Sequence, residues 1–123
     1  MSNTMSNAMP IALPASSAGK LLRIHISEGD TYKGKPLYEA IVAKCREIGI
    51  AGATVFRGLE GYGESAEMHK AHLGHNDRPI VITIVDSAER LAALAPVVEA
   101  MMDTGMTAIS DVQVVRVQKT AKT

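Results

Sequence analysis

The sequence is poor in cysteine and in aromatic residues. Its 123 residues include one cysteine, one phenylalanine, three tyrosines and no tryptophan. A lone cysteine excludes an intrachain disulfide and a zinc site built from several cysteines, which is typical of a protein of the reducing cytoplasm. Because so few rings are available, the core has to be packed from aliphatic side chains and methionine. We expect Cys45 to be a buried apolar residue on a helix.

An excess of charge and long apolar runs are also missing. Thirteen basic residues balance 13 acidic ones, so the basic footprint of sequence-independent nucleic-acid binding is absent. No run approaches the roughly 20 apolar residues of a membrane span, and the N-terminus lacks the cationic start and apolar segment of a secretion signal. The sequence therefore predicts a soluble cytoplasmic protein that does not bind nucleic acid.

Composition divides the chain into three regions. Residues 1–19 mix Ser, Asn, Ala, Met and Pro without periodicity, and we expect them to form a disordered tail. Residues 20–118 have the length of one domain with a single core. Residues 119–123 are expected to form a short polar C-terminal tail.

Four segments are predicted to be strands from their alternation, their β-branched content and the turn residues around them. They are residues 20–27, 51–58, 79–86 and 111–118.

Two helices are predicted between these strands. Pro36 suits the first position of helix one, and Gly49 suits its C-terminal cap. Asp86 and Glu89 form a variant of the capping box before helix two, which is expected to end at Thr104–Gly105. The apolar stripes consist of Leu37, Ile41, Cys45 and Ile48 in helix one and of Leu91, Leu94, Val98 and Met101 in helix two.

The order βαββαβ predicts an α+β fold, a four-stranded antiparallel sheet with two helices on one face. Residues 80–85 are apolar on both sides of the pleat except at Thr83. The face without helices therefore needs a cover, and the sequence contains no third helical layer. We expect a self-associating subunit to cover it.

The loop after the second strand contains the first candidate site. Residues 58–78 are long for a loop in a compact domain, and such loops are usually functional or disordered. At its entrance, closely spaced glycines let backbone N–H groups approach an anion, Arg57 adds a charge and Tyr62 a flat face. The candidate ligand-binding residues are Arg57, Gly58, Gly61, Tyr62 and Gly63. A structural hinge is the alternative interpretation.

Lys33 and Lys35 form a second candidate anion site. They lie near the start of helix one, and a helix N-terminus favours negative charge. The alternative is that both are solvated surface lysines.

Metal binding and catalysis are the remaining hypotheses. His69, His72 and His75 recur every three residues, a spacing that suits a zinc, copper or nickel ion if the segment is helical; an exposed polar loop is the alternative. Ser65 and His69 are the nearest approach to a nucleophile and base, and neither an orienting acid nor an oxyanion hole is evident. We therefore expect a binding protein and not an enzyme.

Several segments resemble, in the same order, the PII-like family catalogued as domain of unknown function family 190, within the GlnB-like superfamily. The resemblance covers about residues 20–117 and is carried by Leu21-Leu22-Arg23-Ile24, Gly34-Lys35-Pro36-Leu37-Tyr38-Glu39-Ala40-Ile41, Gly52-Ala53-Thr54-Val55, Arg57-Gly58, Gly61-Tyr62-Gly63, Pro79-Ile80-Val81 and Ile84-Val85-Asp86. It implies a ferredoxin-like fold, a homotrimer and ligand sites in the clefts between subunits. His69 falls where the family tends to have histidine.

The resemblance also implies a signalling role. A small anionic ligand or adenine nucleotide would bind at a cleft, and loop 58–78 would regulate a partner, which the family suggests is a membrane transporter or channel. Nucleotide-binding PII proteins have a glycine-rich, lysine-containing turn after helix two. Here Thr104 and Gly105 match its beginning, but the later glycines and the lysine are absent from residues 106–111. The alternative function is metal binding or metal tolerance through the loop histidines.

Overall fold

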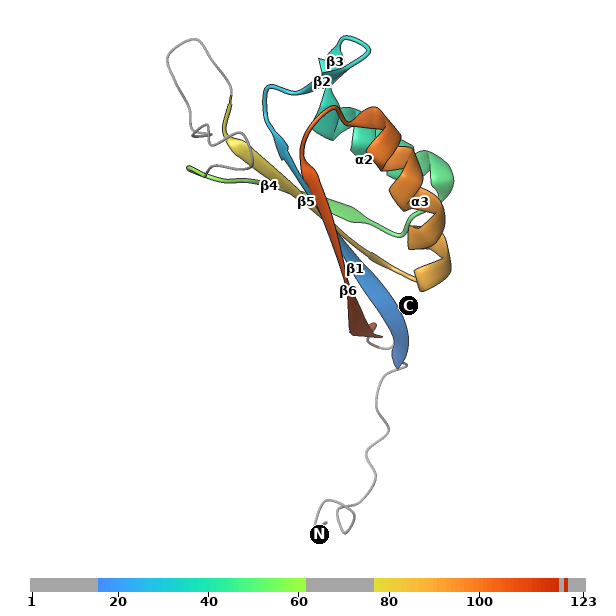
Figure 1. Ribbon diagram of the computed structural model, residues 1–123. Helices are drawn as coiled ribbons and strands as arrows, with labels where there is room; N and C mark the ends of the chain where they lie inside the picture. The colour runs from blue at the N-terminus through green and yellow to red at the C-terminus, as the bar shows by residue number, and fades with distance from the viewer. Residues whose placement is uncertain (1–15, 62–76, 118, 120–123) are drawn as a thin grey trace, which may run out of the picture.

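The computed structural model describes residues 16–61, 77–117 and 119. Its elements are β1 (Ser16–Ser27), β2 (Thr31–Tyr32), β3 (Lys35–Pro36), α2 (Leu37–Ile48), β4 (Ala53–Arg57), β5 (Pro79–Asp86), α3 (Ala88–Met101) and β6 (Met106–Val115) (Figure 1). In this part of the chain, neither helix is long and apolar enough to cross a bilayer.

The main sheet has the strand order β4-β5-β1-β6, and all of its pairings are antiparallel. Both helices lie on the same face of this sheet (Figure 1). This is the ferredoxin-like arrangement, so the predicted α+β fold class is confirmed.

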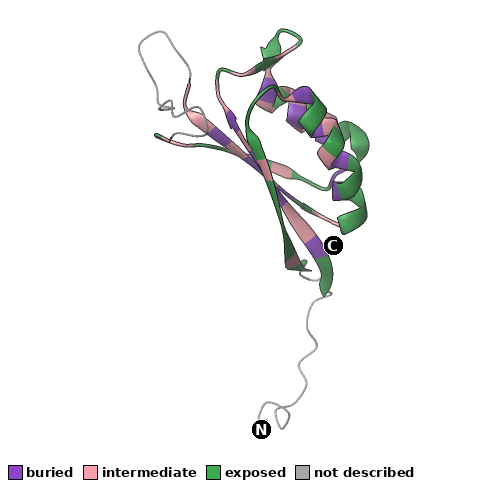
Figure 2. Cartoon of the chain, in the orientation of Figure 1, coloured by how far each residue is buried: buried purple, intermediate pink, exposed green. Residues whose placement is uncertain are grey.

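The core lies between the sheet and the two helices, where Figure 2 shows the buried residues. Alternate residues of the two central strands meet the apolar stripes of the helices, and burial raises the pKa of the Cys45 thiol. The predicted role of Cys45 is confirmed. The core consists of Leu22, Ile24, Ile26, Leu37, Ile41, Cys45, Ile50, Ile80, Ile82, Ile84, Leu91, Leu94, Val98 and Met101.

The other face of the sheet is here called the open face, and neither helix of the described residues lies over it. Residues directly opposite one another in paired strands point to the same face. The register places His25 between Val81 and Met106, with Phe56 opposite Val81 on the far side. Phe56 and Met106 are 54% and 56% exposed. The prediction that β5 is apolar on both faces is confirmed.

The predicted bounds of three strands are wrong, and β4 differs least, spanning Ala53–Arg57 where residues 51–58 were predicted. β1 begins at Ser16, not at residue 20, and residues 16–19 are therefore strand and not part of a loose tail. β6 spans Met106–Val115 and not residues 111–118. The two strands pair continuously from Ser16–Val115 to His25–Met106. This pairing satisfies the backbone N–H and C=O groups of residues 16–19 and 106–110, whose side chains do not predict a strand.

The predicted turn before helix one contains a small hairpin, β2–β3. Lys33 and Gly34 have φ values of 52° and 82°, the backbone of a type I′ turn. Pro36 is the N-cap of α2 and not its first residue.

At the other end of α2, Gly49 adopts the left-handed cap (φ 96°) that the sequence predicts. Ile48 is 38% exposed, so its predicted burial is wrong. Ile50 is buried in its place because the chain turns back toward the core at Gly49.

Helix α3 also differs from its prediction at both ends. Its N-cap is Ser87 and not Asp86: the Ser87 side chain accepts a hydrogen bond from the Arg90 backbone N–H. Asp86 instead accepts from the backbone N–H groups of Ala51 and Ser87, at 3.0 and 2.7 Å. The helix ends at Met101 and not at residues 104–105.

Candidate functional site

Three loops meet at one end of the sheet. β1 ends at Ser27 and β4 at Arg57, next to the first residues of β5 and β6, Pro79 and Met106. We call this the loop end. The β2–β3 hairpin, the turn from α3 to β6 and the entrance to the segment after β4 all lie here (Figure 1). Both candidate anion sites from the sequence therefore belong to the same end of the molecule.

Arg57 is not a free cation. Its Nη2 atom lies 2.6 Å from Oε2 of Glu28, whose side chain is only 13% exposed against 47% for Arg57. A carboxylate with little access to water holds a cation closely, because its remaining partners are few. An anionic ligand at Arg57 has to compete with Glu28, and no local pattern in the sequence indicates this pair.

Gly58 and Gly61 have a steric role beside Pro79. A Cβ at Gly58 would lie 2.7 Å from Cγ of Pro79, and one at Gly61 would lie 3.6 Å from the same atom. The Gly58 N–H also donates to the Pro79 carbonyl at 2.7 Å. Among the described glycines, positive φ occurs at residues 34, 49 and 105 and not at these two. The small size of Gly58 therefore lets the chain leave β4 over the proline ring.

The remaining loop candidates, Tyr62, Gly63 and His69, lie outside the described residues, as do His72 and His75. Within residues 16–61, 77–117 and 119, no cluster of histidine, cysteine or acidic side chains is suited to hold a metal ion.

Lys33 and Lys35 lie on the β2–β3 hairpin and are both exposed. Lys33 is in the left-handed region, and its Nζ lies 5.3 Å from the centroid of the Tyr32 ring. A cation at this distance over an aromatic face is attracted to the ring. Lys35 precedes Pro36, the N-cap of α2. The structure thus places both lysines on a projecting turn at the loop end.

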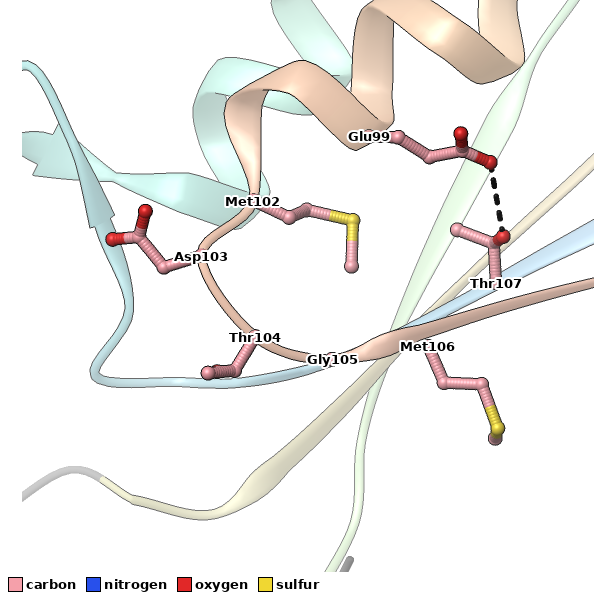
Figure 3. A pocket seen from close by; sticks show the side chains of 7 residues that line it. All are labelled: Glu99, Met102, Asp103, Thr104, Gly105, Met106 and Thr107. Carbon is pink, nitrogen blue, oxygen red and sulfur yellow. Dashed lines mark hydrogen bonds between the residues drawn. The ribbon is translucent and has the colours of Figure 1, made fainter. Parts of the chain in front are cut away.

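A shallow pocket of about 230 Å³ lies at the turn from α3 to β6 (Figure 3). Its lining consists of Glu99, Met102, Asp103, Thr104, Gly105, Met106 and Thr107. Gly105 has φ +123°, and a Cβ there would lie 2.6 Å from the carbonyl oxygen of His25. Only glycine lets this turn pass so close to β1. The sequence of this turn stands out for its missing lysine, and nothing in it predicts a site.

The pocket lining offers hydrogen-bonding groups and no cation. Two of its residues are carboxylates, Glu99 and Asp103, and two are threonines. The Thr107 hydroxyl donates to Oε2 of Glu99 at 3.3 Å (Figure 3). Carboxylates accept hydrogen bonds from hydroxyl and amino groups but repel phosphate. This turn therefore suits the uncharged part of a ligand, and any phosphate needs cations from elsewhere at the loop end.

Most of the chain matches a known protein family. The model of the DUF190 family, described as an uncharacterized ACR, matches residues 19–114. A UPF0166 protein of Aquifex aeolicus is 35% identical over 98 residues, which cover 78% of this chain and 92% of that protein. A UPF0166 protein of Methanocaldococcus jannaschii is also 35% identical over 98 residues, covering 77% and 90%.

Solved structures share the fold. CPII of Thiomonas intermedia K12, bound to ADP and bicarbonate, has a TM-score of 0.61 and 25% identity, covering 83% of this chain and 93% of that one. The divalent ion tolerance protein CutA1 of Ehrlichia chaffeensis has a TM-score of 0.52 and 17% identity, covering 82% and 85%. At that identity the likeness to CutA1 concerns the fold alone.

Proposed function

The chain belongs to the DUF190 family, and from this premise we propose that it is a PII-like regulatory protein that binds an adenine nucleotide at its loop end. The observation that carries the proposal is the likeness to CPII, a nitrogen regulatory PII-like protein solved with ADP, AMP and bicarbonate, at 25% identity across 83% of this chain. The alternative of metal tolerance has no such support, because the likeness to CutA1 is one of fold.

The proposed site divides the nucleotide between two groups of residues. The pocket at the turn from α3 to β6 takes the nucleoside part, because its carboxylates and hydroxyls match ribose and amino groups. The phosphates bind to Lys33, Lys35 and Arg57, which lie at the same end. This arrangement compensates for the lysine missing from the turn itself. Gly58, Gly61, Tyr62, Gly63 and His69 complete the proposed ligand-binding set.

Regulation and assembly belong to the same proposal. Ligand binding changes the order of residues 58–78, which engage or release a partner, by family analogy a membrane transporter or channel. The protein acts by binding and not by catalysis, as a homotrimer with sites between subunits. Exposed apolar side chains on the open face, among them Phe56, Val85 and Met106, support self-association.

Calorimetry on the full-length protein tests nucleotide binding. We expect AMP or ADP to bind with about one site per chain and GDP to bind at least tenfold more weakly. Bicarbonate is included in a parallel titration, since CPII was solved with it. The absence of saturable binding by AMP, ADP and ATP up to millimolar concentration contradicts the proposal.

Paired variants test the division of the site. A double variant in which alanine replaces both Lys33 and Lys35 is expected to bind ADP about tenfold more weakly. Its affinity for adenosine should fall less than twofold. Lys44→Ala is the matched control, because Lys44 lies on α2 and is paired with Glu47. Equal weakening of ADP and adenosine contradicts the assignment of the lysines to phosphate.

A further inference from the structure

A hydrogen bond joins Glu99 and Thr107 across the pocket at the turn from α3 to β6. Glu99 lies in the last turn of α3, and its backbone carbonyl accepts from the Met102 N–H at 3.2 Å. Thr107 lies opposite the buried Ile24 in the sheet, so its side chain points to the face that the helices cover. Its hydroxyl donates to Oε2 of Glu99 at 3.3 Å. The carboxylate is therefore held between the end of the helix and the sheet.

The neighbouring side chains leave this pair facing the pocket. Figure 3 shows Met102 reaching from the end of the helix into the space beside Glu99 and Thr107. The Asp103 side chain lies across the turn and points away from the pair (Figure 3). Glu99 is thus the carboxylate that a molecule in the pocket would meet, and the thioether of Met102 provides an apolar wall beside it.

One oxygen of Glu99 is available to a ligand. Within residues 16–61, 77–117 and 119, the only hydrogen bond of its side chain is the one from Thr107 to Oε2, and it forms no ion pair. Each carboxylate oxygen accepts hydrogen bonds, so Oε1 can take a donor from outside the protein. The bond from Thr107 also restricts the rotamers of a long side chain, which lowers the entropic cost of binding a ligand.

The size and lining of the pocket suit the sugar of a nucleotide. Its volume of about 230 Å³ is below the roughly 300–1,000 Å³ of a site that encloses a whole ligand. None of the residues that line it is aromatic, so the lining offers no ring on which a base would stack. Ribose presents two neighbouring hydroxyl groups, and an acidic side chain accepts from a ribose hydroxyl in Rossmann dinucleotide sites. A carboxylate in a pocket of this size therefore matches the sugar.

We propose that Glu99 accepts hydrogen bonds from the ribose hydroxyls of the bound nucleotide, and that the site thereby selects ribonucleotides against nucleotides without these hydroxyls. Thr107 is a positioning residue, because it acts through the carboxylate that it holds. Selection arises because a sugar without hydroxyls displaces water from Glu99 and returns no hydrogen bond. The inference rests on the proposed function, in which this pocket takes the nucleoside part.

Calorimetry with two nucleotides on the full-length protein tests the role of Glu99. ADP and 2′,3′-dideoxy-ADP differ in the two ribose hydroxyls, and the parent is expected to bind ADP at least tenfold more tightly. Glu99→Ala, which suits a helix, should reduce this ratio to less than threefold, mainly by weakening ADP binding. Glu89→Ala is the matched control: it removes a carboxylate from the first turn of the same helix and should leave the ratio within twofold of the parent's.

Two substitutions at Thr107 separate positioning from packing. Thr107→Val removes the hydroxyl and keeps the β-branched shape, and it should lower the ratio of the two affinities at least threefold. Thr107→Ser keeps a hydroxyl and should retain the parent's ratio within twofold. A ratio for Thr107→Val equal to that of the parent overturns the positioning role.

The outcomes separate this inference from the proposed function. A parent that binds no adenine nucleotide overturns both. A parent that binds ADP and 2′,3′-dideoxy-ADP equally overturns the role of Glu99 alone, and this measurement does not depend on a variant that folds. IDP, which lacks the amino group of adenine, tests recognition of the base. If Glu99→Ala changes the ratio of ADP to IDP affinity and not that of ADP to 2′,3′-dideoxy-ADP, Glu99 contacts the base and the inference is overturned.

Discussion

Nη2 of Arg57 lies 2.6 Å from Oε2 of Glu28, and this ion pair joins the end of β4 to the residue that follows β1. The Glu28 backbone N–H also donates to the carbonyl of Arg78, just before β5. Glu28 therefore connects three segments at the loop end. The arginine that the sequence assigns to an anionic ligand is bound to a carboxylate of the protein when no ligand competes.

Replacing one partner of this ion pair at a time is expected to change the affinity for the ligand in opposite directions. Arg57→Ala should weaken ADP binding about tenfold, since a hydrogen bond to a charged group contributes roughly 1.5–3 kcal/mol. Glu28→Gln removes the negative charge that competes with the ligand for Arg57, and it should strengthen ADP binding about two- to fivefold. Calorimetry measures both values. If Glu28→Gln weakens ADP as much as Arg57→Ala does, the pair serves the fold and not the ligand.

Replacing Gly105 with alanine is expected to destabilise the protein by about 2 kcal/mol or more. Gly105 has φ +123°, and the added Cβ would lie 2.6 Å from the His25 carbonyl oxygen and 2.7 Å from Cε of Met102. Gly52→Ala is the control, because nothing lies within 4 Å of its Cβ position, and it should change the free energy of unfolding by less than about 0.5 kcal/mol. Urea denaturation compares the two variants, and similar values for both contradict this account of the turn.

Asp86 is expected to make stability depend on pH. Its side chain is 7% exposed, and burial acts to raise its pKa, but hydrogen bonds from Ala51 and Ser87 and the charge of Arg90 outweigh this effect and lower the pKa below its ordinary value. A carboxylate with a lowered pKa stabilises the folded state above its ordinary pKa of about 4, and the contribution is lost as pH falls through the lowered value.

The measurement for Asp86 is the free energy of unfolding at pH 7 and at pH 3. Asp86→Asn should be less stable than the parent at pH 7, and this difference should shrink at pH 3. Glu89→Gln, in the exposed first turn of α3, is the control. A deficit of Asp86→Asn that stays constant across this range shows that the charge of Asp86 does not contribute.

Lys33→Asn is expected to stabilise the fold and to weaken ligand binding. Lys33 occupies the left-handed region with φ 52°, where asparagine has a lower conformational cost, so the variant should gain about 0.5 kcal/mol. The loss of charge should weaken ADP severalfold if Lys33 contacts phosphate. Lys35→Asn, in the extended strand β3, should weaken ADP without the gain in stability. Thermal melts and calorimetry separate the two effects.

The candidate site could be predicted from the sequence only in part. The sequence predicted two candidate sites, one at Arg57 and Gly58 and one at Lys33, and both lie at the loop end. The pairing of Arg57 with Glu28 joins residues 29 positions apart in the sequence, and no local pattern encodes such a contact. The pocket at residues 99–107 was missed as a site because it is formed by a turn whose shape depends on the close approach of Gly105 to β1.

The sequence by itself determined the fold class, the two helices and the core. Alternation in β1 and the stripes of Leu37, Ile41 and Cys45 and of Leu91, Leu94 and Val98 are local periodicities, which separate buried from exposed faces without knowledge of partners. The lengths of the strands and the contacts at the loop end were decided by tertiary structure. Residues 16–19 and 106–110 have little strand signal of their own. They form strands because residues 16–19 pair with residues 112–115, and residues 106–110 with residues 21–25, which satisfies their backbone hydrogen bonds.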